Sequence, residues 1–175
     1  MATVTPGAFP HNAFTDVLLA NRDFSQKFVD SGLAGTARRG LAIITCIDSR
    51  INPLAVVGMM AGDVKILRNA GARVTDDVLR TLVLATYLLG VDRVLVMPHT
   101  DCRMTQDDES AIHDMISQRH GVDTRSLEFR TVSNQREALA SDIERIKSFA
   151  YLPTGIIVGG AIYDVRSGVL EPVDC

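Results

Sequence analysis

Three short apolar runs, separated by segments of helical character, constrain the fold of this chain more than any other feature. The runs are residues 41–45 (LAIIT), 64–67 (VKIL) and 93–97 (RVLVM), and they are rich in β-branched and aliphatic side chains. Short runs of this kind are typical of buried strands. Residues 76–90 precede the third run and read as a helix, with acids in the first turn and glycine at the exit. This alternation predicts an α/β fold whose mostly parallel sheet is flanked by helices and built with right-handed crossovers.

The rest of the chain extends the same pattern. The spacing of apolar residues predicts further helices over 14–31, 107–119 and 134–152, and a short strand over 127–132. After residue 153 the sequence reads as a strand, a turn at Ser167-Gly168 and a final strand at the edge of the sheet.

The length of 175 residues favours one domain with a substantial core. Pro6, Gly7 and Pro10 lie close together near the N-terminus, and they indicate an irregular arm. We therefore assign residues 1–13 to an N-terminal arm and residues 14–175 to a single folded domain.

Soft metal ligands follow two of the predicted strands. Cys46 comes directly after the first apolar run, and His99 and Cys102 follow the third. If the second and third strands flank the first on opposite sides, their connections diverge at its carboxyl end, where open α/β sheets bind ligands. A cysteine, a histidine and a second cysteine are three of the four ligands that Zn²⁺ takes, and the open fourth position is typical of a catalytic zinc. The sequence therefore predicts one Zn²⁺ per chain, bound by these three residues.

Each of these residues also has an ordinary interpretation. A lone cysteine such as Cys46 is most often a small buried hydrophobe, and His99 alone would be a hydrogen-bonded loop histidine. Asp48 and Arg50, which follow Cys46 closely, could form a structural ion pair. The joint pattern favours zinc, because it places a carboxylate and a guanidinium beside the open position of the metal.

Composition excludes several other classes of function. A net charge of −3 gives no general attraction to nucleic acid or to an anionic membrane. The chain has no tryptophan and no run near the roughly 18 apolar residues of a membrane span. Three scattered cysteines are too few for a disulfide framework, and the first residues lack the pattern of a signal peptide. We expect a cytoplasmic protein with no nucleic-acid or membrane partner.

Five motifs, in this order, carry a resemblance to a known family. They are ANRDF (20–24), CIDSR (46–50), GDVKILRNAG (62–71), HTDC (99–102) and GAIYDVRSGVL (160–170). In these motifs the chain resembles the β-class carbonic anhydrases, most closely the compact microbial type. The resemblance implies that residues 14–175 form a zinc domain that reversibly hydrates CO₂ to bicarbonate and a proton by zinc-bound hydroxide. It also implies a homodimer or an assembly of dimers.

The resemblance assigns Cys46, His99 and Cys102 to zinc, and Asp48 and Arg50 to a catalytic dyad. The physical roles agree with this assignment. Two thiolates cancel the charge of Zn²⁺ and weaken it as a Lewis acid, so neighbouring groups must help to stabilise hydroxide. Asp48 can orient that hydroxide, while Arg50 holds Asp48 off the metal by a bidentate pair. We therefore expect the open state of the site near or above neutral pH, with water rather than Asp48 as the fourth zinc ligand.

The turn at 69–71 is expected to line the substrate pocket through Ala70 and Gly71, where glycine lets the backbone approach closely. One residue departs from the family pattern: Arg103 stands where glycine usually follows the HTDC motif. Its bulk and charge bear on access to the metal.

Two other functions remain open. A hydrolase of a CO₂ analogue, CS₂ or COS, would use the same zinc and dyad. A metal-free cysteine enzyme or redox protein would use Cys46 or Cys102 with His99, but the chain has no C-x-x-C motif.

Overall fold

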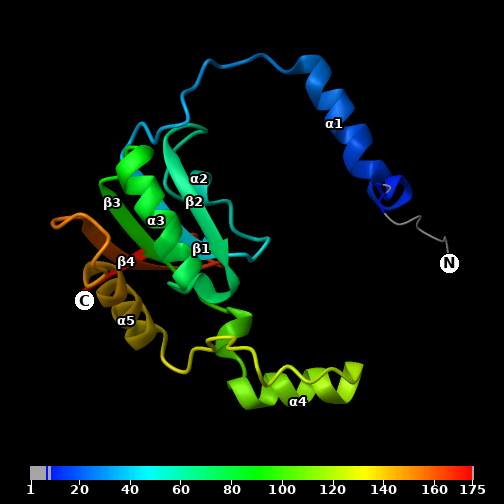
Figure 1. Cartoon of the computed structure of the whole chain (residues 1–175), viewed down its shortest axis with the longest axis vertical. Coiled ribbons are helices and arrows are strands. Elements are labelled where there is room, and N and C mark those ends of the chain that lie inside the picture. The colour runs from blue at the N-terminus through cyan, green and yellow to red at the C-terminus, as the bar shows by residue number, and fades with distance from the viewer. Residues whose placement is uncertain (1–6, 8, 175) are drawn as a thin grey trace. The chain divides into compact units, whose positions relative to one another are not determined.

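The computed structural model describes residue 7 and residues 9–174, and it divides the chain into two compact units (Figure 1). The first unit ends at Leu33 and the second begins at Ala34. Residues 1–6 and 8 of the predicted arm lie outside the described residues. The boundary that we placed after residue 13 stays a prediction.

The N-terminal unit consists of a 3-10 helix, η1 (His11–Phe14), and the helix α1 (Thr15–Lys27). The helix predicted over 14–31 is therefore present but ends four residues early, because Phe28 takes an extended backbone conformation. No residue of η1 or α1 is buried. Their large apolar side chains include Phe24, which is 60% exposed, and Val17, which is 56% exposed.

The second unit is built on a five-stranded sheet in the order β2-β1-β3-β4-β5. Its strands are β1 (Leu41–Cys46), β2 (Val64–Asn69), β3 (Arg93–Met97), β4 (Ile157–Tyr163) and β5 (Leu170–Val173). The first four are parallel, and β5 pairs antiparallel with β4 at the edge of the sheet. This confirms the predicted fold class, including the terminal edge strand. Because β2 and β3 lie on opposite sides of β1, the chain leaves the carboxyl end of β1 at a topological switch point.

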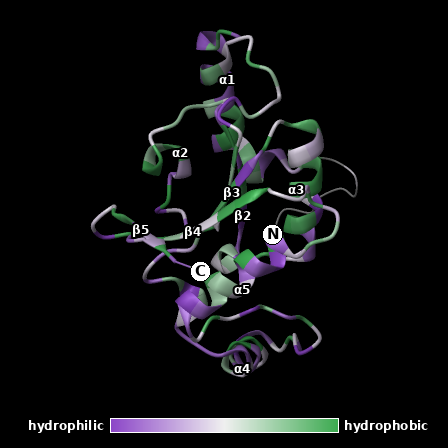
Figure 2. Ribbon diagram, turned by 90° about the vertical axis from the view of Figure 1, so that its left-hand side faces the viewer, coloured by the Kyte–Doolittle hydropathy of each residue, from purple (hydrophilic) through white to green (hydrophobic). Residues whose placement is uncertain are grey.

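Two helices cover one face of this sheet. They are α3 (Asp76–Leu88) and α5 (Gln135–Lys147), which begin at the side-chain caps Thr75 and Asn134. They pack on alternate strand residues such as Ile44 and Val96. In Figure 2 the central strands and α3 are coloured largely hydrophobic, as a buried layer requires.

The opposite face has a smaller cover. The short helix α2 (Pro53–Val56) and the turn after it pack on residues such as Ile43 and Met97. Neighbouring residues of β1, such as Ile43 and Ile44, pack on opposite faces of the sheet because side chains alternate along a strand.

The helix predicted over 107–119 is present as α4 (Glu109–His120), preceded by a 3-10 turn, η3 (Arg103–Thr105). The strand predicted over 127–132 is wrong, because this segment is irregular. Its backbone N–H groups at Phe129 and Arg130 donate to the carboxylate of Glu109 on α4 instead of to a neighbouring strand. Arg130 has φ +59°, which also breaks an extended run.

Within the described residues, every helix falls short of the length and apolar content that crossing a bilayer requires.

Candidate metal centre

The three predicted metal ligands meet at the carboxyl ends of β1 and β3. Cys46 is the last residue of β1, while His99 and Cys102 lie in the turn after β3. A single parallel bridge between His99 and Tyr163 extends the sheet at this point. All three side chains are buried, and their ligand atoms lie within 4.8 Å of one another. The fold thus brings together residues that are far apart in the sequence.

The geometry of these atoms fits a tetrahedral metal. The sulfur atoms of Cys46 and Cys102 are 3.9 Å apart, close to the separation of about 3.8 Å expected for two thiolates on one Zn²⁺. Nδ1 of His99 lies 2.8 Å from the carbonyl oxygen of Thr100, to which it can only donate. In the neutral imidazole, Nε2 is then the unprotonated nitrogen. Nε2 is buried and has no hydrogen-bond partner among the described residues, so a metal ion would satisfy it.

Hydrogen bonding already favours one thiolate in this cluster. The hydrogen bond between the sulfur atoms of Cys102 and Cys46, together with smaller contributions, lowers the pKa of Cys46 to about 3 despite its burial. The same hydrogen bond and burial raise the pKa of Cys102 well above its usual range. Burial works against a charged His99, but the adjacent Cys46 sulfur and the Thr100 carbonyl oxygen outweigh it and raise the pKa of the imidazole. A metal bound between the two sulfur atoms would displace the thiol protons, because the thiolate is the form that binds metal.

The predicted dyad lies beside the ligands. Arg50 Nε is 3.0 Å from Asp48 Oδ1 and Arg50 Nη2 is 2.7 Å from Asp48 Oδ2, a bidentate pair. These side-chain hydrogen bonds, with one from the Arg50 backbone N–H, hold the pKa of Asp48 well below its usual range. Asp48 Oδ2 lies 3.8 Å from Nε2 of His99. The carboxylate is therefore ionised and adjoins the ligand cluster while both of its oxygens face Arg50.

Sequence reasoning missed the role of Asp101. Its carboxylate receives a hydrogen bond of 2.8 Å from Arg50 Nη1, and its carbonyl oxygen accepts another from Nη2. Asp101 has φ +56°, a backbone conformation that few non-glycine residues adopt. The signal was present, since Asp101 is the third residue of the HTDC motif. This residue ties the dyad on the β1 turn to the β3 turn.

Arg68 was also missed. It projects from β2 and donates to the carbonyl oxygens of Cys46 at 2.8 Å, Asp48 at 2.6 Å and Ile51 at 3.3 Å. One side chain thus holds the whole turn that carries the first ligand and the dyad. Nothing in the sequence apart from its place in the GDVKILRNAG motif indicated this contact.

The turn predicted to line the pocket forms the 3-10 helix η2 (Ala70–Ala72). Gly71 has φ +78°, and its N–H donates to Cys46 Sγ at 3.4 Å. A Cβ at Gly71 would lie 3.2 Å from Met104 Cγ, so the close approach needs glycine. Ala70 is exposed beside it. Arg103 pairs with Asp107, just before α4, and its guanidinium lies 3.9 Å from Met115 Sδ on α4.

Comparison with known proteins agrees with this site. Residues 41–170 match the sequence profile of a family described as carbonic anhydrase. The β-carbonic anhydrase 1 of Mycobacterium tuberculosis (strain H37Rv) is 32% identical over 164 residues, covering 91% of this chain and 97% of the relative. The chain belongs to the β-carbonic anhydrase family. This confirms the family resemblance and the prediction of a carbonic anhydrase-type enzyme.

Two further relatives of this β-carbonic anhydrase are informative. The crystal structure of carbonic anhydrase from Streptococcus mutans matches with a TM-score of 0.87 and 32% identity, covering 95% of this chain and 99% of the other. The carbon disulfide hydrolase of Acidithiobacillus thiooxidans is 23% identical over 154 residues, or 77% of each chain. This chain is therefore also similar to a protein named for another substrate.

Proposed function

We propose that this protein catalyses the zinc-dependent, reversible hydration of CO₂ to bicarbonate and a proton. The observation that carries the proposal is the buried cluster of Cys46, His99 and Cys102 directly beside the Asp48–Arg50 pair. Zinc bound there would act as a Lewis acid and lower the pKa of water, an effect that the two thiolates weaken and that the neighbouring dyad would support. The unpartnered Nε2 of His99 supports a metal rather than a purely structural role for the cluster.

The dyad would orient the reacting water. An ionised Asp48 accepts hydrogen bonds only, so it can take one from a water or hydroxide at the metal and fix its direction. Arg50 keeps the carboxylate ionised and holds both oxygens. This arrangement supports the open state, in which Asp48 stays off the metal. Ala70 and Gly71 would line the substrate pocket on the side of Cys46.

A combined assay tests the proposal. Freshly purified protein should contain one Zn²⁺ per chain by atomic emission, and stopped-flow measurements should detect CO₂ hydration that chelation abolishes and zinc restores. Zinc-loaded protein without hydration activity would refute the reaction. Protein that carries no zinc would support the metal-free alternative, a cysteine enzyme or redox protein.

A second candidate is hydrolysis of CS₂ or COS on the same centre. The likeness to the carbon disulfide hydrolase of Acidithiobacillus thiooxidans favours keeping it. Release of H₂S from CS₂ or COS, measured on the same preparation, would discriminate: a larger kcat/KM for either compound than for CO₂ would replace the first proposal.

We also propose that the enzyme is a homodimer or an assembly of dimers and that it works in the cytoplasm. The apolar side chains that α1 leaves exposed, such as Leu18 and Phe24, support an interface with a second copy. A reducing compartment suits a centre that needs both Cys46 and Cys102 as thiolates. Sedimentation showing only a 19.0 kDa species at micromolar concentration would contradict the dimer.

A further inference from the structure

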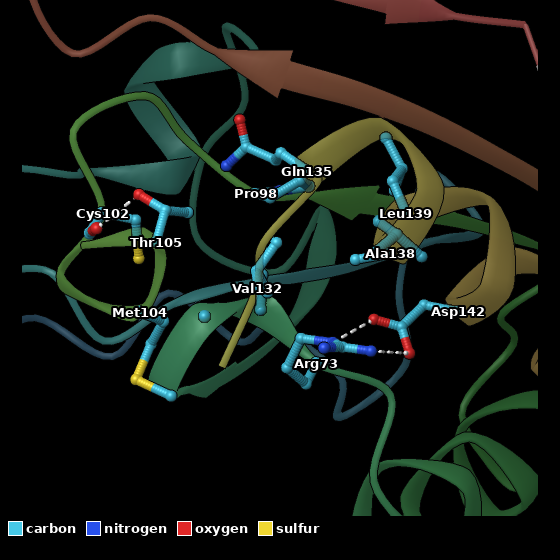
Figure 3. A pocket seen from close by; sticks show the side chains of 13 residues that line it. Arg73, Pro98, Cys102, Met104, Thr105, Val132, Gln135, Ala138, Leu139 and Asp142 are labelled. Atoms are coloured by element: carbon cyan, nitrogen blue, oxygen red, sulfur yellow. Dashed lines mark hydrogen bonds and ion pairs between the residues drawn. The ribbon is translucent and has the colours of Figure 1, made fainter. Parts of the chain in front are cut away.

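A buried ion pair lies behind the metal centre, on the face of the sheet that α5 covers. Arg73 Nε is 2.7 Å from Asp142 Oδ2, and the two side chains are only 15% and 5% exposed. Asp142 lies among Leu139, Ile143 and Ile146 on the buried face of α5. Figure 3 shows the pair at one end of a small pocket that Cys102 and Met104 also line. A charge pair in such a place adds little stability over a well-packed apolar pair, so its presence calls for another explanation.

Arg73 closes the turn that approaches Cys46. The amide of Asn69 donates to the carbonyl oxygen of Arg73 at 2.6 Å, and its oxygen accepts from the Arg73 N–H at 2.8 Å. Between these two residues lie Gly71 and Ala72, both with positive φ. The left-handed backbone conformation strains Ala72, so the turn needs contacts with other segments to keep its shape.

The ion pair provides those contacts. Its guanidinium also donates to the carbonyl oxygen of Arg130 at 3.2 Å. The far end of the turn is thereby fixed to α5 and to the segment after α4. As a result, the N–H of Gly71 points at Cys46 Sγ and donates a hydrogen bond to it. A hydrogen bond to a thiolate stabilises its charged form, which is the form that binds metal.

The same helix reaches the turn after β3, which bears two of the predicted ligands. Gln135, seven residues before Asp142 and on the same face of α5, donates to the carbonyl oxygen of His99 at 2.8 Å. The α5 helix therefore contacts the η2 turn, which approaches Cys46, and the turn that bears His99 and Cys102.

We propose that Arg73 and Asp142 are positioning residues that hold the Gly71 N–H on the Cys46 ligand and so strengthen metal binding. The inference rests on the proposed zinc site. It assigns to the ion pair a role in metal affinity beyond its role in packing.

A double variant separates the two roles. Arg73→Met with Asp142→Leu replaces the pair by apolar side chains without leaving a lone buried charge. The matched control is Arg38→Met with Asp63→Leu, which removes a partly buried pair of 2.8 Å at the opposite end of β2. Zinc dissociation constants are measured by chelator competition at fixed pH, with denaturant unfolding alongside. The cobalt-substituted proteins report the thiolate-to-metal absorption band.

We expect the Arg73/Asp142 double variant to raise the zinc dissociation constant about tenfold, the lower end of effects seen for outer-sphere partners. Its cobalt spectrum should shift, and the amide proton of Gly71 should exchange at least about tenfold faster. The control should match the wild type within twofold in all three. An unchanged affinity and unchanged Gly71 exchange in the double variant would overturn the inference.

Two safeguards keep the result decisive. If the double variant does not fold, Asp142→Asn replaces it, since it keeps the shape and one acceptor oxygen; affinity and exchange within twofold of wild type then overturn the inference. If the wild type binds no zinc, the proposed function fails, and Gly71 exchange alone decides whether the ion pair positions the turn.

Discussion

The turns at the carboxyl ends of β1 and β3 contrast sharply with the helices α1 and α4. In the turns, Arg68, Arg50 and Asp101 connect backbone and side chains into one network around buried ligands. The described residues of α1 and α4, by comparison, include none that is buried.

This difference distinguishes the part of the structure that a single chain can form from the surface that needs a second surface to cover it. The turns derive their geometry from contacts within the second unit, so a single chain is expected to form them. The exposed apolar residues of α1 gain stability only when another surface covers them. Substitutions in the turns should therefore change metal content and turnover, whereas substitutions in the helices should change assembly or local stability.

The largest effect is expected from removing a ligand. Cys46→Ser or Cys102→Ser should abolish stoichiometric zinc and lower the melting temperature, because metal binding is coupled to folding. Atomic emission and thermal unfolding measure both. Full zinc occupancy in either variant would remove that residue from the ligand set.

Asp48→Asn should keep zinc but reduce kcat/KM for CO₂ hydration by about 10²–10⁴-fold, the range of general base and orientation effects. The amide keeps the shape of the carboxylate and loses its charge. Stopped-flow hydration at equal zinc content is the measurement. Turnover near that of the wild type would make the Asp48–Arg50 pair purely structural.

Arg50→Ala should also reduce turnover while zinc stays bound, for a different reason: Asp48, freed from Arg50, can ligate the metal. A structure of zinc-loaded wild type above pH 8 gives the reference. There we expect no Asp48 oxygen within the Zn–carboxylate distance of about 2.0 Å, and a ligated Asp48 would contradict the open state.

On α1, Leu18→Asp should raise the dimer dissociation constant at least tenfold, because a charge replaces an apolar side chain worth about 1.5–3 kcal/mol when buried. Asn21→Asp adds the same charge at a polar, exposed position of the helix and serves as the control. Sedimentation velocity follows both, and equal behaviour of the two variants would place the interface elsewhere. Zinc content should not change in either.

The smallest effect is expected near α4. The Phe129 ring packs on His113 with centroids 5.0 Å apart, a contact worth about 0.5–1.5 kcal/mol beyond its buried area. Phe129→Ala should speed amide exchange along α4 and leave zinc affinity unchanged. A loss of zinc would mean that α4 and the metal turns are coupled.

Sequence reasoning located the sheet and the cluster of Cys46, His99 and Cys102 because both depend on local pattern. Buried runs such as 41–45 and 93–97 can hardly be anything but strands, and Cys46 and His99 stand where these runs end. It failed at 127–132, since alternation there mimics a strand while Glu109 satisfies the backbone. It also missed Asp142, whose surroundings in the sequence resemble an ordinary helix surface. Contacts made through space between distant side chains leave no local pattern to find.

The placement of the ligands along the chain has a consequence for folding order. His99 and Cys102 are separated by three positions, so even an unfolded chain can offer them together to a metal ion. Cys46 joins them when β1 pairs with β3, and β2 and α3 lie in the chain between these two strands. Metal binding by all three residues would then signal that β1 and β3 have paired. A captured ion would clamp β1 to β3 and hold β2 and α3 inside a closed loop, which would slow unfolding of the sheet.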